Sequence, residues 1–539
     1  MKQKILLSLL LLFAASSASA YDFVVNGIYY NINGNEATVT FKGYGNMQTG
    51  YYSGDVTIPE TVTHNGVTYA VTAIGRNAFA SCIDPTTVTI PKSITDIASF
   101  SFNGSSGITS ITISSDNPIY DSRDNCNAII RTANNKLIAG CKNTVIPNTV
   151  TTIGNGAFWG CNSLTSVDIP NSVTTLEVQA FAYCTGLTSV TIGSSVTLID
   201  QDAFGCCSSI TSITIDSSNP RYDSRDNCNA IIRTASNTLI FGCQTTVISN
   251  TVTTIGSWAF QECTGLTNIT IPNSVKTIND HAFLNCTGLA NATIPNSVKT
   301  IGDYAFSGCS ALTSVNIPKS VTTIGNNPFS SCAGVMSITV ESGNPKFDSR
   351  DNCNAIISTA NNKLIIGCKN TIIPNSITSI GRSAFNDCIG LTSVTLPNTI
   401  TSIEENAFED CKDLKDVYSY ITDLTNVSIG EGAFKLFRYT SNYSQRTLHV
   451  PNGTADAYQA DNNWEPYFGT IVEMDPVNIP GDINGDGEVN IADFNALAYM
   501  LLEVNATIED SPAADVNGDG KIDIDDIPAM IDKIVNFLQ

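Results

Sequence analysis

The chain contains 539 residues, with 27 Lys and Arg against 49 Asp and Glu, and its net charge is −22. This length exceeds what one globular core normally organises, so the residues must form several domains or a repeat array. The acidic balance argues against nucleic-acid binding, because little basic charge is available to neutralise phosphates.

The first twenty residues have the pattern of a secretory signal peptide. Lys2 and Lys4 precede an apolar run at 5–13, and small residues end the segment at 18–20. This pattern predicts cleavage before Tyr21, which is not the cysteine that a bacterial lipoprotein anchor needs. No later stretch approaches the ~18 apolar residues of a membrane helix. We therefore expect an exported bacterial protein that is secreted or held at the cell surface, without a membrane span.

Residues 21–74 contain several short alternating apolar segments, which predict a β-rich N-terminal cap. After this segment, phenylalanine recurs, usually as Ala-Phe, with gaps of 23 residues, three gaps of 56 and a last gap of 26. A fixed period of this length predicts a solenoid in which each unit buries its apolar side against its neighbours. The recurring positions are Phe79, Phe102, Phe158, Phe181, Phe204, Phe260, Phe283, Phe306, Phe329, Phe385, Phe408 and Phe434.

The unit at 153–176 shows how one coil is built. Val167 and Ile169 alternate with Ser166 and Asp168, so the apolar pair should point inward and the polar pair outward. Stacked units then form a parallel β-sheet along one face, with the Ala-Phe segment on the return side. The outward positions of the later units are nearly all Ser, Thr or Asn, which predicts a uniform polar surface.

The motif I-G-x-x-A-F-x-x-C-x-x-L-T-S-V-x-I-P-x-S-V occurs at 153–173, 255–275 and 301–321, and with small variations at 380–400. This motif resembles the BspA-type (Treponema-type) leucine-rich repeat family of bacterial surface proteins. The resemblance implies a leucine-rich repeat solenoid over 75–440 and a closing cap and linker at 441–479. It also implies an adhesin or ligand-binding role on the cell surface, through a protein or glycan ligand.

Three similar insertions interrupt the array near 115–143, 217–245 and 342–370. Each pattern predicts a β-hairpin that protrudes from the solenoid and offers a candidate ligand surface. The repeated Asp-Ser-Arg-Asp, with Asp121, Arg123 and Asp124 in the first copy, fits a turn held by its own hydrogen bonds, and a repeated ligand clamp is the alternative.

The 17 cysteines fall into groups. Those at the repeat position are expected to be buried free thiols that bond to backbone, and Ser105 takes this position in one coil. Pairing Thr132 with Asn135 would place Cys126 opposite Cys141, so each insertion could form a disulfide or keep free thiols. The corresponding pairs in the other copies are Cys228 with Cys243 and Cys353 with Cys368. No spacing favours zinc.

The segment 480–539 is strongly acidic and holds two loops of calcium-binding type, each followed by a helical pattern. Oxygen donors stand at loop positions 1, 3, 5, 7, 9 and 12, where position 7 contributes its backbone carbonyl. We expect two Ca2+ ions. The candidate ligands are Asp482, Asn484, Asp486, Glu488, Asn490 and Asp493 in the first loop, and Asp515, Asn517, Asp519, Lys521, Asp523 and Asp526 in the second.

Aspartate at position 12 and the duplicated loop-helix layout resemble a type I dockerin. This resemblance implies a small calcium-folded domain that binds a cohesin module on another protein. Positions 10 and 11, Ile491-Ala492 and Ile524-Asp525, differ from the small hydroxyl pairs of many cellulosomal dockerins. A self-contained stabilising module at the C-terminus is the alternative.

No paired carboxylates or Ser/His/Asp set favour an enzyme. We expect a non-enzymatic, adhesin-like binding protein with a calcium-dependent dockerin-like anchor. The alternative is a non-catalytic structural subunit of an extracellular polysaccharide-degrading complex, recruited through dockerin–cohesin pairing. Trp159 and Trp258 lie beside Ala-Phe pairs, where they either pack on the next coil or contact a ligand.

Overall fold

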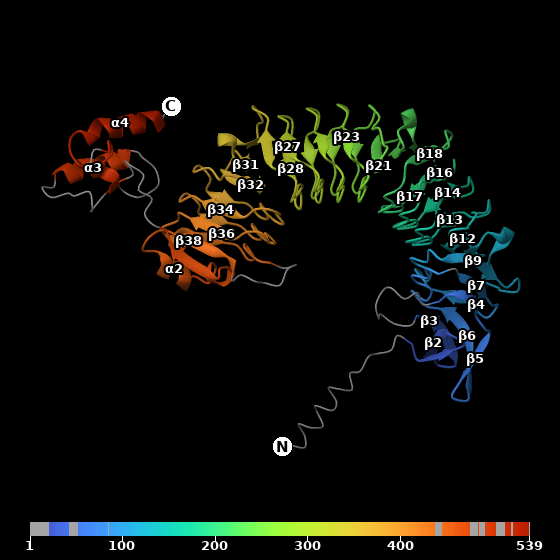
Figure 1. Ribbon diagram of the computed structural model, residues 1–539. Helices are drawn as coiled ribbons and strands as arrows, with labels where there is room; N and C mark the ends of the chain where they lie inside the picture. The colour runs from blue at the N-terminus through green and yellow to red at the C-terminus, as the bar shows by residue number, and fades with distance from the viewer. Residues whose placement is uncertain are drawn as a thin grey trace, which may run out of the picture. The chain divides into compact units, whose positions relative to one another are not determined.

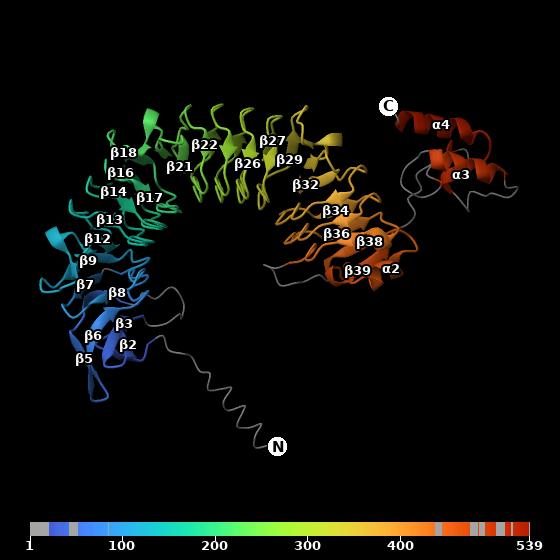
Figure 2. The same cartoon turned by 180° about the vertical axis from the view of Figure 1, so that it is seen from behind.

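The computed structural model describes residues 21–41, 52–84, 86–436, 445–474, 483, 491–502, 512–518 and 521–537. The expected signal peptide lies outside these residues. The chain falls into two compact units, the first comprising residues 1–313 and 320–334 and the second comprising 314–319 and 335–539. Figure 1 shows the chain from one side and Figure 2 shows it from behind. Each unit is described separately below.

The first unit begins with a small sheet of the order β1-β2-β3-β6-β5. Strand β6 also pairs in parallel with β8 of the first coil, so the backbone edge of the array is satisfied by the sheet. The strands are β1 (Phe23–Val25), β2 (Ile28–Asn33), β3 (Glu36–Thr40), β5 (Thr61–His64), β6 (Val67–Ile74) and β8 (Asp96–Ile97).

The main ladder of the first unit consists of parallel strands in register, which form three separate sheets, β4-β7-β9, β14-β16-β18 and β23-β25. Val167 pairs with Val190, Val190 pairs with Ile213, and all three side chains are buried. The expected alternation is confirmed, and proline often follows each strand, where its missing N–H cannot extend the ladder. The strands are β4 (Gly54–Thr57), β7 (Thr86–Ile90), β9 (Ile108–Ile113), β14 (Ser166–Ile169), β16 (Ser189–Ile192), β18 (Ser212–Ile215), β23 (Asn268–Thr270) and β25 (Asn291–Thr293).

A second ladder consists of two-residue strands, each with one inward aliphatic residue that is buried in all of them except β28, where Ile324 is partly buried. These strands also pair in parallel from coil to coil, and Figure 2 shows both ladders from β13 to β18. They are β13 (Thr152–Ile153), β15 (Thr175–Leu176), β17 (Leu198–Ile199), β22 (Thr254–Ile255), β24 (Thr277–Ile278), β26 (Thr300–Ile301) and β28 (Thr323–Ile324).

The return side is held by the recurring phenylalanines. Phe260, Phe283 and Phe306 stack with 4.9 Å between neighbouring ring centroids, and all three are essentially unexposed. Two positions around each phenylalanine adopt left-handed backbone angles, as at Gln179 (φ 56°) and Tyr183 (φ 60°) beside Phe181. These tight bends let each coil turn within a few residues.

The predicted β-hairpin is confirmed in each insertion, because β11 and β12 and their counterparts pair antiparallel. The expectation that the hairpins protrude is wrong, since they are built into the stack. In the first copy, β12 pairs in parallel with β13, and β11 is buried at Ala128, Ile129 and Ile130. Each copy therefore adds a rung to the second ladder. The strands are β10 (Tyr120–Asp121), β11 (Ala128–Arg131), β12 (Lys136–Gly140), β19 (Tyr222–Asp223), β20 (Ala230–Arg233), β21 (Thr238–Gly242), β30 (Phe347–Asp348), β31 (Ala355–Ser358) and β32 (Lys363–Gly367).

The second unit repeats this architecture and ends with a closing layer. Sheet β34-β36-β38-β39 is parallel, and helix α2 lies over its end with buried Tyr458 near fully buried Trp464. The elements are β27 (Ser314–Ile317), β29 (Ser337–Val340), β33 (Ser379–Ile380), β34 (Ser393–Leu396), β35 (Ser402–Ile403), β36 (Asp416–Ser419), β37 (Ser428–Ile429), β38 (Thr447–Val450), α2 (Ala455–Ala460) and β39 (Thr470–Glu473).

Two longer helices follow, α3 (Ile491–Leu502) and α4 (Asp526–Phe537). Leu497 of α3 and Met530 of α4 are unexposed and share a small core with Ala514 and Val516. Among the residues that the structure describes, no helix is long and apolar enough to cross a membrane.

Candidate functional sites

The strand faces carry the expected polar surface. The outward residues of β14, β16 and β18 are Ser166/Asp168, Ser189/Thr191 and Ser212/Thr214, and they alternate with buried aliphatic residues. The same alternation recurs at Asn268/Thr270, Ser314/Asn316 and Ser393/Thr395. Apart from the carboxylate of Asp168, these outward groups are uncharged hydroxyls and amides, which can donate and accept hydrogen bonds.

The strand face of the second unit includes a cluster that the sequence did not reveal. His449 Nε2 lies 2.9 Å from Asp416 Oδ1, and the His449 ring stacks on Tyr418 at 4.3 Å. The three residues come from paired positions of β36 and β38, which are more than thirty residues apart in the chain. Only the register between these strands could have identified them.

The Asp-Ser-Arg-Asp motif acts as an internal brace. Arg123 Nη2 donates to Asp121 Oδ2 at 2.7 Å, Arg123 Nε donates to Asp121 Oδ1 at 2.9 Å, and Arg123 Nη1 donates to Asn135 Oδ1 at 2.9 Å. The pairs Arg225–Asp223 and Arg350–Asp348 repeat the arrangement. Because the guanidinium already forms hydrogen bonds within its own hairpin, the motif is a turn held by internal hydrogen bonds and not a ligand clamp.

The paired cysteines of the insertions do not face each other. A β-bulge between Ile129 and Ile130 shifts the register, so Ala128 pairs with Gly140 and the thiols of Cys126 and Cys141 enter different cores. The expected opposition of Cys126 and Cys141 is wrong because one extra residue turns the side chains to opposite faces. All 17 cysteines are free thiols.

The repeat cysteines bond to backbone as expected. Cys184 Sγ donates to the carbonyl of Phe158 at 3.0 Å, and Cys207 Sγ donates to that of Phe181 at 3.0 Å. Ser105 Oγ makes the same bond to Phe79 in the coil that lacks the cysteine. Burial raises the pKa of Cys161 to about 12, so such thiols are protonated at neutral pH.

A cavity of about 260 Å³ lies at the second insertion. There, Leu239 pairs with Ile255, and the N–H of Gly242 bonds to the carbonyl of Ala259. The inserted coil therefore spans its return loop with residues 240–241, where the next coil uses 256–259. The two missing residues leave a gap between neighbouring return loops.

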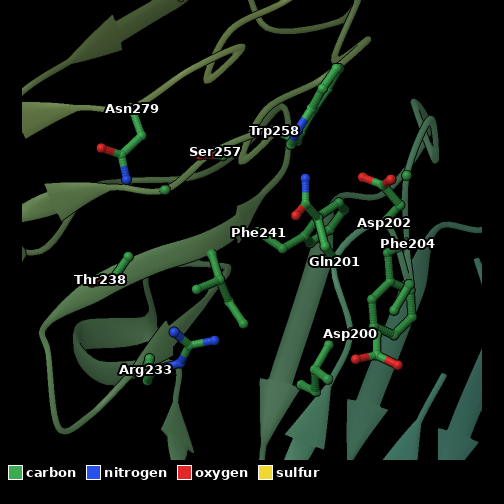
Figure 3. Close-up of a pocket in the computed structure, with 15 residues that line it drawn as sticks. Asp200, Gln201, Asp202, Phe204, Arg233, Thr238, Phe241, Ser257, Trp258 and Asn279 are labelled. Carbon is green, nitrogen blue, oxygen red and sulfur yellow. The ribbon is translucent and has the colours of Figure 1, made fainter. Parts of the chain in front are cut away.

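Aromatic and charged side chains line this cavity (Figure 3). The Trp258 indole, the Gln201 amide and the Asp202 carboxylate lie at one end, and Asp200 and Arg233 lie at the other. Asp202 Oδ1 is buried without a hydrogen-bond partner, and burial raises the pKa of this carboxyl group. An unpartnered buried acceptor is costly, and a bound donor would relieve the cost.

Part of the predicted calcium loops lies within the described residues. In both loops the position-12 aspartate accepts the N–H of position 2. Asp493 Oδ1 accepts from Ile483 at 2.9 Å, and Asp526 Oδ1 accepts from Val516 at 2.8 Å. Both carboxylates are unexposed. Each loop thus contains the same internal hydrogen bond, which orients the aspartate at position 12.

The second loop shows further turns of this kind. Asp515 Oδ1 accepts the N–H of Gly518 at 2.8 Å, and Asp526 Oδ2 accepts the N–H of Asp523 at 2.9 Å. Within the described part of the chain, His, Cys, Asp and Glu side chains form no group of three or more that could hold a metal ion. The predicted ligands Asp482, Asn484, Asp486, Glu488, Asn490 and Asp519 lie outside that part.

The described ligand candidates still fit calcium by their chemistry. Asp515, Asn517, Asp523 and Asp526 offer hard oxygen donors, and the Lys521 backbone offers a carbonyl. Calcium would supply the positive charge that such closely spaced carboxylates otherwise lack. These residues would hold the ion by direct oxygen contacts.

The stacked parallel strands, the phenylalanine column and the thiol–backbone bonds define a leucine-rich repeat solenoid. The family model "BspA type Leucine rich repeat region" matches six copies at residues 61–128, 135–225, 240–356 and 362–450. These ranges cover more than half of the chain, so the protein belongs to the BspA-type leucine-rich repeat family. The model "Dockerin type I domain" matches residues 480–535, and domains of this class generally bind calcium. Both families are typically non-catalytic, and no catalytic domain was matched.

Solved structures with a similar chain path include a leucine-rich repeat protein from Bacteroides ovatus, with 22% identity, a TM-score of 0.33 and coverage of 84% of this chain and 100% of that one. A leucine-rich cell surface protein from Faecalibacterium prausnitzii has 22% identity and a TM-score of 0.25, covering 86% and 96%. The pneumococcal vaccine antigen PcpA has 15% identity and a TM-score of 0.38, covering 85% and 100%. At these scores the likenesses carry no argument about function. Among curated proteins, none matches this chain.

Proposed function

We propose that this chain is an exported, non-catalytic binding protein, secreted or held at the cell surface. Its solenoid binds a protein or glycan ligand in an adhesin-like role, and its dockerin domain joins it to a cohesin-bearing partner. The observation that carries this proposal is the combination in one chain of a long repeat surface with a type I dockerin match at 480–535. A solenoid offers extended surface for recognition, and a dockerin is an assembly module.

The dockerin is proposed to fold around two Ca2+ ions. The ligands would be Asp482, Asn484, Asp486, Glu488, Asn490 and Asp493 for one ion, and Asp515, Asn517, Asp519, Lys521, Asp523 and Asp526 for the other. The equivalent hydrogen bonds to Asp493 and Asp526 support a duplicated site. Because free carboxylates at this density repel one another, the domain should lose its fold when calcium is removed.

A second role is favoured by the type I dockerin match itself. In this alternative the chain is a structural subunit of an extracellular polysaccharide-degrading complex, and the solenoid is a spacer or scaffold. The two roles differ in which part of the chain carries binding. An adhesin binds matrix protein through residues 75–437, whereas a complex subunit depends on the C-terminal domain.

The test measures binding of the full chain to purified type I cohesin modules by surface plasmon resonance, in calcium and in EGTA. A matched set compares Asp515→Ala with Asp532→Ala, since Asp532 is an exposed carboxylate of α4 outside the proposed ligand set. We expect cohesin binding only in calcium, lost in Asp515→Ala and kept in Asp532→Ala. Equal binding in EGTA, or equal loss in both variants, would refute calcium-dependent pairing.

A parallel measurement uses fibronectin and fibrinogen with the full chain and with a chain that ends at Asp475. Matrix-protein binding that survives the truncation supports the adhesin-like role. Binding to cohesin alone supports the complex-subunit role. Calorimetric titration of the full chain with Ca2+ counts the ions directly, and a stoichiometry other than two contradicts the proposed ligand sets.

A further inference from the structure

The cavity at the second insertion lies where the return loop of the inserted coil lacks two residues. Asp202 precedes Phe204 by two residues and Trp258 precedes Phe260 by two residues, so they occupy the same slot in their coils. The inserted coil between them has no residue at this slot, because its return loop is two residues shorter. Asp202 and Trp258 therefore belong to coils that are not consecutive, and both line the cavity. Phe241 of the inserted coil also lines it, with its ring centroid 5.6 Å from that of Phe204.

Trp258 offers an aromatic wall to this gap. Its indole stacks on His281 with 3.9 Å between centroids and 6° between planes, and His281 stacks on Tyr304 at 5.2 Å. Burial lowers the pKa of His281, which keeps this stack uncharged at neutral pH. Since His281 covers one face of the indole and is not part of the cavity wall, the opposite face borders the cavity.

The other walls of the cavity supply both hydrogen-bond acceptors and hydrogen-bond donors. Asp202 Oδ1 is a buried acceptor without a donor, Asp200 adds a second carboxylate, and Arg233 adds donors. The Gln201 amide both donates and accepts. Two carboxylates and one guanidinium leave a net negative charge, which disfavours phosphate and carboxylate ligands. A ligand that suits these walls is uncharged, rich in hydroxyl groups and flat on one face.

We propose that this cavity binds one neutral pyranose ring. The C–H face of the sugar lies on the exposed face of Trp258, its hydroxyls donate to Asp202 and Asp200, and Arg233 donates to a hydroxyl oxygen. The volume of about 260 Å³ is slightly below the ~300–1,000 Å³ of drug-sized pockets, which suits a single sugar unit. This site rests on the proposed ligand binding by the solenoid and names a glycan as its ligand, and it involves no residue of the dockerin.

The first insertion shows what happens when the protein fills the same gap itself. Phe100 and Gly156 occupy the slots of Asp202 and Trp258, and a Cβ on Gly156 would lie 2.5 Å from the Phe100 ring. The Phe100 ring thus occupies the gap left by the two missing residues. A cavity of about 200 Å³ remains there, but Arg131 and Lys136 line it and no aromatic ring does. The chain therefore contains both a filled and an open version of this gap.

This comparison supplies the decisive variant. The double substitution Asp202→Phe/Trp258→Gly places the Phe and Gly of the first insertion at the same slots of the second, with Phe241 unchanged where the first insertion has Ala139. It should close the cavity without unfolding the coil. The control is Trp159→Ala, which removes another half-buried tryptophan outside the cavity, whose ring lies tilted against Tyr183 with 5.1 Å between centroids. Thermal unfolding followed by circular dichroism shows whether each variant keeps its fold.

Binding is measured by saturation-transfer-difference NMR on the full calcium-loaded chain, without cohesin. The probes are the methyl glycosides of glucose, galactose, mannose and N-acetylglucosamine, with choline as a cationic probe. We expect saturable binding of at least one glycoside, kept in Trp159→Ala and weakened about tenfold or more in the double variant. The inference is overturned if no glycoside binds, if the double variant binds as well as the parent, or if only choline shows this dependence. None of these outcomes bears on cohesin pairing.

Discussion

Replacing one ring in the phenylalanine column tests whether the column holds the return side. Phe283 is unexposed and lies 4.9 Å from both Phe260 and Phe306, so it contacts a ring on each side. Phe283→Ala should cost about 3–5 kcal/mol, from lost burial and from the cavity left behind. The two ring pairs, at about 0.5–1.5 kcal/mol each, are part of that sum.

In a one-dimensional array this loss falls on the altered coil and its immediate neighbours. Hydrogen exchange read by mass spectrometry resolves the effect along the chain. We expect faster exchange in β22, β24 and β26, and unchanged exchange in β33 and β35. Phe283→Leu is the control, because it keeps apolar volume and should cost under about 1.5 kcal/mol. The reasoning fails if Phe283→Ala costs no more than Phe283→Leu, or if distant coils lose equal protection.

Three other outcomes follow from the thiols and from the cavity. Cys184→Ser should keep the hydrogen bond to the Phe158 carbonyl, because Ser105 makes the equivalent bond in its own coil. Cys184→Ala should lower the free energy of unfolding, measured in urea, by about 1 kcal/mol. Equal losses in the two variants would show that this hydrogen bond does not stabilise the coil. Burial raises the pKa of Cys161 and Cys263 from 9.0 to about 12, so these thiols lose their protons at lower pH in the unfolded chain than in the folded one. The melting temperature should therefore fall as the pH rises from 9 toward 12. A melting temperature that stays constant over this range would contradict the prediction. Asp202→Asn should raise the melting temperature at neutral pH, because burial raises the pKa of this carboxyl and its ionised form is penalised only in the folded state. That gain should vanish as pH falls below the ordinary aspartate value of 3.8, and a gain that persists there would exclude this cause.

The sequence predicts the periodic part of the fold because each coil meets the same environment. The 23-residue period, the inward Val167 and Ile169, and the buried thiol slot follow directly from which residues recur. The structure confirms these features. Repetition averages out the local ambiguity that limits single-segment predictions.

The insertions were harder to predict because their register depends on one residue. A bulge beside Ile129 reverses the side on which Cys141 lies, and nothing in the hairpin pattern marks the bulge. The burial of β11 likewise depends on pairing between β12 and β13, which joins segments from different coils. Pairing of this kind becomes visible only in three dimensions.

The sequence contains only a weak indication of the cavity. Fewer residues separate Leu239 from Gly242 than separate Ile255 from Phe260, although both segments run from the second ladder to the return side. Counting residues between equivalent positions would have located the gap, but only once the pairing was known. The cluster of Asp416, Tyr418 and His449 required the register of β36 and β38 in the same way.

In the first two insertions, the shortened return loop lies beside a cavity in the array. The inserted coil pairs with the next coil in the second ladder, while its return loop omits two residues. Glycine replaces phenylalanine in the inserted coil, so each insertion interrupts the phenylalanine column and allows different side chains beside it. The side chains beside such an omission are free to diverge, as Phe100 with Gly156 and Asp202 with Trp258 already do. Duplicating this insertion would therefore give one scaffold several independently adjustable positions along its length.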